Sequence, residues 1–145
     1  MIAVSECLIG RNCRYDGGSK LDEAILTLFE RGEAICICSE CLGGLPTPRE
    51  PSEIEPGFSG EDVLDGRARV FSESGDDVTD FFLKGAEIAL KVCVENGVTR
   101  AILKSESPSC GCGEIYDGTF EGGIVSGDGV MAAILKRHGI AVQCR

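Results

Sequence analysis

The chain has 145 residues, 43% of them hydrophobic, which suits a single globular domain over residues 1–145. A formal net charge of −10 argues against direct nucleic-acid binding, and the apolar runs are too short to span a membrane. Nine cysteines, with no secretory leader after Met1, favour metal ligation or thiol chemistry in the cytoplasm over disulfides in a secreted protein.

Strand-like and helix-like segments alternate along the chain, a pattern typical of a parallel sheet covered by helices. We therefore expect an α/β fold: a single three-layer Rossmann-like domain with a mostly parallel sheet and helices on both faces. The predicted strands are 2–7, 34–38, 69–71, 100–104 and 140–143, and the predicted helices are 21–31, 78–96 and 129–137.

The segment 78–96 has the strongest helical pattern, because its apolar residues repeat on one stripe and its charged residues lie opposite. Asp77 or Thr79 is expected to cap its start, and Gly97 fits its end. The segment 43–66 is rich in proline and glycine, so we predict a long, ordered, irregular loop there.

Three cysteines occupy corresponding places in this pattern. Cys7 closes the first predicted strand, Cys38 closes the second, and Cys110 lies in the loop after the strand 100–104. Parallel sheets bind ligands outside the carboxyl ends of their strands, so these thiols are expected to converge at one edge. Cys36 and Cys93 are predicted to be buried structural thiols.

The same cysteines lie in three motifs of unusual composition. The motifs are Ser5-Glu6-Cys7-Leu8-Ile9-Gly10 followed by Arg14-Tyr15-Asp16-Gly17, then Cys38-Ser39-Glu40 leading into Gly43-Gly44-Leu45-Pro46-Thr47-Pro48-Arg49, and finally Ser107-Pro108-Ser109-Cys110-Gly111. With Tyr116-Asp117-Gly118-Thr119-Phe120, they occur in the order seen in the thiouracil desulfidase family, which this sequence resembles over nearly its whole length.

The resemblance implies a [4Fe-4S] cluster held by Cys7, Cys38 and Cys110, the trio already picked out by their places at strand ends. A three-cysteine set leaves one iron open for the sulfur of a small thiolated nucleobase such as thiouracil. The activity expected from this is non-redox desulfuration, in which water attacks the carbon and sulfide stays on the iron.

Catalysis is assigned to Glu40 as the general base, because it matches the glutamate of the family motif, and to Ser107 beside Cys110. Ser109 and Arg49 are the candidate substrate-binding residues, although Arg49 could instead anchor its loop. Glu6 and Glu106 are alternative carboxylates.

Two departures from the family pattern leave other readings open. Ser39 replaces a proline, and Cys13, Cys41 and Cys112 add thiols, any of which could supply a fourth ligand. The alternatives are a structural zinc site of Cys38, Cys41, Cys110 and Cys112, a thiol oxidoreductase using Cys38 and Cys41, and a cluster that delivers sulfur to a thiolation partner. The oligomeric state is not readable from the sequence.

Overall fold

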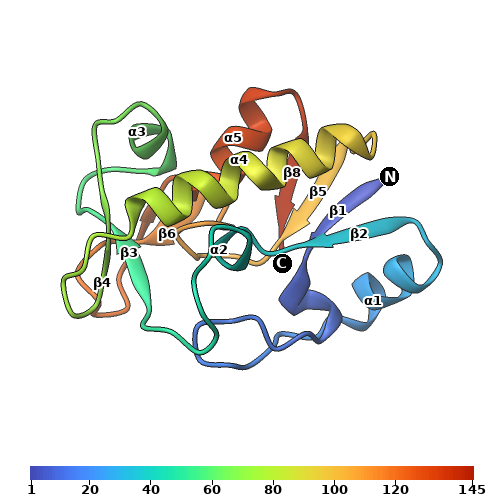
Figure 1. Cartoon of the computed structure of the whole chain (residues 1–145), viewed down its shortest axis with the longest axis horizontal. Helices are drawn as coiled ribbons and strands as arrows, with labels where there is room; N and C mark the ends of the chain where they lie inside the picture. The colour runs from blue at the N-terminus through green and yellow to red at the C-terminus, as the bar shows by residue number, and fades with distance from the viewer.

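Four parallel strands form the central sheet of the computed structural model, which describes residues 1–145 (Figure 1). Their order across the sheet is β2-β1-β5-β8. The register pairs Ile2 of β1 with Ala34 of β2 on one side and with Arg100 of β5 on the other. The strands are β1 (Ile2–Ser5), β2 (Ala34–Ile37), β5 (Arg100–Leu103) and β8 (Ala141–Cys144).

Helices cover both faces of this sheet, so the predicted α/β architecture is confirmed. After β1, the chain adds β2 on one side of that strand, and it then adds β5 and β8 in turn on the other side. Right-handed crossovers then place α1 (Glu23–Glu30) on one face, and α4 (Thr79–Glu95) and α5 (Val130–Arg137) on the opposite face.

Two hydrophobic cores follow from the alternation of side chains along the strands. Ala3 and Leu103 belong to the larger core beneath α4 and α5, whereas Val4 and Ile102 belong to the smaller core beneath α1. All four residues are at most 3% exposed, so the sheet is buried on both faces, as its apolar sequence requires.

The predicted long helix is confirmed as α4, and Gly97 follows its end as predicted, but the N-cap prediction of Asp77 or Thr79 is wrong: the N-cap is Val78, which makes no side-chain capping bond. The carboxylate of Asp77 accepts hydrogen bonds from the backbone N–H and the hydroxyl of Thr79, at 3.0 and 2.6 Å. Gly97 follows the helix with φ of 65°, a left-handed conformation that glycine adopts without steric cost. None of the helices is both long and apolar enough to cross a membrane.

The prediction of an irregular loop over 43–66 is wrong in two places. This segment contains β3 (Ser52–Ile54) and α3 (Gly60–Leu64), elements too short to show a hydrophobic period. Strand β3 pairs antiparallel with β4 (Val70–Ser72), so the predicted strand at 69–71 exists but lies outside the central sheet.

Four further short elements were not predicted, and two of them carry site residues. The first predicted strand ends early, at Ser5, and Cys7 lies in the 3-10 helix η1 (Glu6–Ile9). Glu40 lies in α2 (Ser39–Leu42), a single helical turn directly after Cys38. Strands β6 (Glu114–Tyr116) and β7 (Ile124–Ser126) form a separate antiparallel pair.

Candidate functional site

A cavity of about 470 Å³ opens at the carboxyl ends of β1, β2 and β5. It lies where the order of the parallel strands reverses around β1, the place at which open α/β sheets bind ligands. Its wall includes four thiols, two hydroxyls, a carboxylate and a guanidinium that matter below: Cys7, Cys13, Cys38, Cys110, Ser107, Ser109, Glu40 and Arg49.

The three cysteines expected to converge do line this one cavity. Cys7 reaches it from η1, Cys38 from the first position after β2, and Cys110 from the loop that follows β5. Cys7 and Cys110 are 6% and 9% exposed, so both thiols are shielded from bulk water. Their function as ligands stays a prediction, but their convergence is a structural fact.

A fourth thiol, that of Cys13, belongs to the same group. Its sulfur, the Cys38 sulfur and a carboxylate oxygen of Glu6 all lie within 4.8 Å of one another. Cys13 also belongs to the same buried hydrophobic cluster as Cys7. The sequence offered Cys13, Cys41 and Cys112 equally as additional thiols, and this geometry brings Cys13 to the cavity wall.

The thiols of Cys13, Cys38 and Cys110 have raised pKa values and are neutral at ordinary pH. A hydrogen bond with Cys38 favours the Cys13 thiolate, but the bond with Cys7 and burial outweigh it, and the pKa of Cys13 rises to about 12. Burial raises the pKa of Cys110 to about 11. The pKa of Cys38 is raised further, by its hydrogen bond with Cys13 and by burial. A bound metal would displace these protons and convert the thiols to thiolate ligands.

The loop that carries Cys110 is held by the start of helix α5. The N–H groups of Val130 and Met131 donate to the carbonyl oxygens of Pro108 and Ser109, at 2.7 and 3.0 Å. The first turn of a helix has unpaired N–H groups that need such acceptors. The loop therefore caps α5, and α5 in turn fixes the position of Cys110.

Helix α2, which carries Glu40, is fixed by a close backbone contact with α4. A methyl group added at Gly85 would collide with the carbonyl oxygen of Ser39, and one added at Gly43 would collide with that of Phe81. Glycine at both positions lets the two helices approach at backbone distance. This contact sets where Glu40 points.

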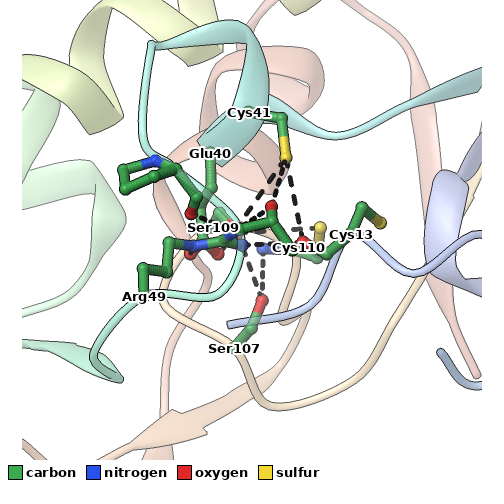
Figure 2. Close-up of polar contacts among 9 residues, drawn as sticks. Cys13, Glu40, Cys41, Arg49, Ser107, Ser109 and Cys110 are labelled. Carbon is green, nitrogen blue, oxygen red and sulfur yellow. Dashed lines mark hydrogen bonds and ion pairs between the residues drawn. The ribbon is translucent and has the colours of Figure 1, made fainter. Parts of the chain in front are cut away.

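Glu40 and Arg49 form a nearly buried ion pair (Figure 2). Arg49 Nε donates to Glu40 Oε1 at 3.1 Å, and the two side chains are only 6% and 15% exposed. The other Arg49 nitrogens donate to the carbonyl oxygens of Cys13 and Pro46 and to the Thr47 hydroxyl. Arg49 thus ties the Cys13 loop to α2, with every nitrogen engaged by protein acceptors.

A chain of hydroxyls connects Glu40 to the loop of Cys110. Ser109 Oγ donates to Glu40 Oε2 at 2.7 Å, so its only hydroxyl hydrogen is used there. Ser107 Oγ lies 3.3 Å from Ser109 Oγ and must therefore be the donor in that contact. The N–H of Cys110 donates to Ser107 Oγ at 2.8 Å. Figure 2 shows these side chains gathered between α2 and the Cys110 loop.

Two of the alternative readings fit this geometry poorly. Cys112 forms a disulfide with Cys144, so the four-thiolate zinc set is not assembled. A thiol oxidoreductase needs a nucleophilic cysteine with a lowered pKa, whereas the pKa values of both Cys38 and Cys41 are raised. Cys41 contacts Thr47 and Arg49 instead of lining the cavity.

The sequence analysis missed several residues of the cavity wall. Both tyrosines of the chain, Tyr15 and Tyr116, line it, and each lies in a motif that had been noted without a role. Glu106, which had been named as an alternative carboxylate, and Phe120 also line it, and they are the non-glycine residues with positive φ, 75° and 59°. Such backbone strain concentrates at functional sites. Residue spacing gives no signal for a strained φ.

Comparisons with known proteins point in one direction. The model of a family described as 2-thiouracil desulfurase matches residues 2–145. The uncharacterized protein YbbK of Bacillus subtilis (strain 168) is 48% identical over 142 residues, covering 98% of this chain and 93% of that protein. A solved structure described as the [4Fe-4S]-dependent thiouracil desulfidase TudS has 46% identity and a TM-score of 0.86, covering 99% of this chain and 89% of that one.

Proposed function

Because this chain belongs to the 2-thiouracil desulfurase family, we propose that it is an iron–sulfur enzyme that removes sulfur from a small thiolated nucleobase such as thiouracil. The observation that carries the proposal is the hydroxyl chain from Glu40 to Ser107, which ends beside Cys110 in the cavity that also holds the other thiols. It joins a proton acceptor to a site suited to iron.

The thiols fit a [4Fe-4S] cluster, whose protein ligands are cysteine thiolates. We assign the ligands as Cys7, Cys38 and Cys110, which approach from three different segments and line one cavity. When bound, such a cluster would leave one iron without a protein ligand, and that iron would supply a Lewis acid for the thiocarbonyl sulfur of the substrate. Cys13 lies close enough to compete for that position.

The hydroxyl chain has the direction that hydrolysis needs. Ser107 takes a proton from water as its own proton passes to Ser109 and that of Ser109 passes to Glu40. The oxygen of the water bonds to the thiocarbonyl carbon and the carbon–sulfur bond breaks. The products are the oxo base and hydrogen sulfide, so the reaction consumes one water and no electrons.

Two residues assigned to substrate binding have contacts that favour other roles. Ser109 gives its hydroxyl hydrogen to Glu40, so we place it within the proton relay. Arg49 has all its nitrogens engaged, and its ion pair holds the Glu40 side chain in its orientation. Although burial alone would lower it, the pKa of Arg49 is raised by Glu40, which is consistent with a permanent ion pair.

The proposal is tested on protein purified without oxygen, in the reducing conditions expected of the cytoplasm. We expect about four irons and four sulfides per chain. With thiouracil in ¹⁸O-labelled water, the uracil formed should carry one ¹⁸O for each sulfide released. Release of sulfide only in the presence of an acceptor protein would favour a sulfur carrier instead.

Variants separate the proton relay from the metal centre. Glu40→Gln should keep the cluster but lower the rate at least about 100-fold, the usual scale of general base catalysis. Glu73→Gln, which lines the same cavity without joining the relay, is the matched control and should keep activity. Alanine at Cys7, Cys38 or Cys110 should abolish iron retention. Retention in those variants, but not in Cys13→Ala, would overturn the ligand assignment.

A further inference from the structure

Ser5 is a buried hydroxyl at the carboxyl end of β1, 2% exposed, and the proton relay does not use it. Its Oγ lies 3.4 Å from the sulfur of Cys110, a residue 105 positions away in sequence. The same oxygen accepts a hydrogen bond of 2.9 Å from the backbone N–H of Lys104, the residue directly after β5. Ser5, the last residue of β1, therefore connects this strand to the backbone that follows β5, and its hydroxyl lies next to the sulfur of a proposed ligand.

The hydrogen-bond inventory determines the direction of the contact with Cys110. A ligating thiolate has no hydrogen, so Cys110 can only accept. Ser5 already accepts from Lys104, and its single hydroxyl hydrogen is free to point at the sulfur. The other nearby hydroxyl, Ser109 Oγ, is 3.7 Å from the Cys110 sulfur and gives its hydrogen to Glu40 at 2.7 Å.

We propose that Ser5 is a positioning residue for the iron–sulfur centre, whose hydroxyl donates to the Cys110 sulfur, orients that ligand and withdraws negative charge from it. This inference rests on the proposed function, because it requires Cys110 to bind iron. Hydrogen bonds to ligand sulfurs are one of the factors by which proteins set cluster potentials.

The contact differs from ordinary packing in its effect on charge. A hydroxyl hydrogen directed at the sulfur draws negative charge away from a ligating thiolate, which van der Waals packing does not do. Ser5 lowers the electron density on one ligand of the cluster and thereby stabilises the reduced form. Loss of the hydroxyl should lower the midpoint potential of the bound cluster.

The experiment compares wild type with Ser5→Ala and Ser5→Thr, all loaded with iron and sulfide without oxygen. We expect Ser5→Ala to have a lower midpoint potential, and Ser5→Thr, which keeps the hydroxyl, to return toward the wild-type value. Resonance Raman spectra of the wild type should show iron–thiolate bands that shift in D₂O, and this shift should shrink in Ser5→Ala.

Ser39→Ala is the matched control, because Ser39 is also 2% exposed and lies beside the ligand Cys38, but makes no hydrogen bond to a sulfur. The midpoint potential of the cluster in Ser39→Ala should equal that in the wild type. Equal potentials and equal D₂O shifts in wild type and Ser5→Ala would overturn the inference. If Ser5→Ala does not fold, the wild-type D₂O shift and the midpoint potential of Ser5→Thr still test the inference. It then requires a D₂O shift in the wild type and a Ser5→Thr potential near the wild-type value. A wild type that binds no cluster would instead refute the proposed function.

Discussion

Cys93 shows what burial alone does to a thiol in this molecule. It is 0% exposed within α4, and burial raises its pKa to about 11. Because the pKa is higher in the folded than in the unfolded chain, the stabilisation is complete below about pH 8.5 and is lost as pH rises through 11. We expect the free energy of unfolding of the metal-free protein to fall by about 3 kcal/mol over this range on account of Cys93.

The measurement is urea denaturation of the metal-free chain at pH 8 and at pH 11, for wild type and Cys93→Ala. The variant is expected to be less stable at pH 8, since it leaves a small cavity, but its stability should depend less on pH. Val92→Ala, a truncation at the neighbouring position of α4, should keep the wild-type pH dependence. Equal slopes for wild type and Cys93→Ala would contradict the prediction.

In helix α4, the effect of a glycine on stability depends on what the helix packs against. Alanine is ordinarily the better residue inside a helix, by about 1 kcal/mol over glycine. At Gly85, however, the added methyl would collide with the carbonyl oxygen of Ser39 in α2. We expect Gly85→Ala to lower stability by about 1–3 kcal/mol, as overpacking does, and to reduce desulfuration by displacing Glu40.

Urea denaturation and the rate of sulfide release measure the two effects. Glu87→Ala, an exposed change on the same helix, should alter neither quantity by much. A Gly85→Ala protein that is more stable than wild type, with full activity, would mean that the contact between α2 and α4 does not hold Glu40.

The whole molecule is organised so that the site exists only when the sheet is complete. The thiols come from the segments after β1, β2 and β5, and these strands share both hydrophobic cores. Binding of a cluster to the folded chain alone must stabilise that chain. We expect removal of iron by a chelator to lower the melting temperature by at least about 5 °C.

Circular dichroism and the visible absorption of the cluster should be lost together, in one transition, if residues 1–145 form a single domain as the sequence predicts. Two separate transitions would contradict that organisation. A melting temperature unaffected by the chelator would mean that metal binding does not stabilise the folded chain, which contradicts the prediction.

Much of the architecture was predictable because the long elements carry a clear hydrophobic period. Helix α4 and the four strands of the sheet were anticipated within a few residues. The short elements α3 and β3 were not, since three to five residues carry too little pattern. The disulfide between Cys112 and Cys144 was not predicted either, because it depends on the pairing of β8 with β5.

The sequence by itself determined that Cys7, Cys38 and Cys110 meet, because cysteines that follow parallel strands must lie at one edge of the sheet. Only the tertiary structure decided which thiols joined them: Cys13 lies at the cavity, and Cys112 is bonded elsewhere. It also decided the partners of Glu40 and Arg49. A hydrogen-bond partner depends on angstrom distances between residues far apart in the chain, and no spacing along a sequence specifies those distances.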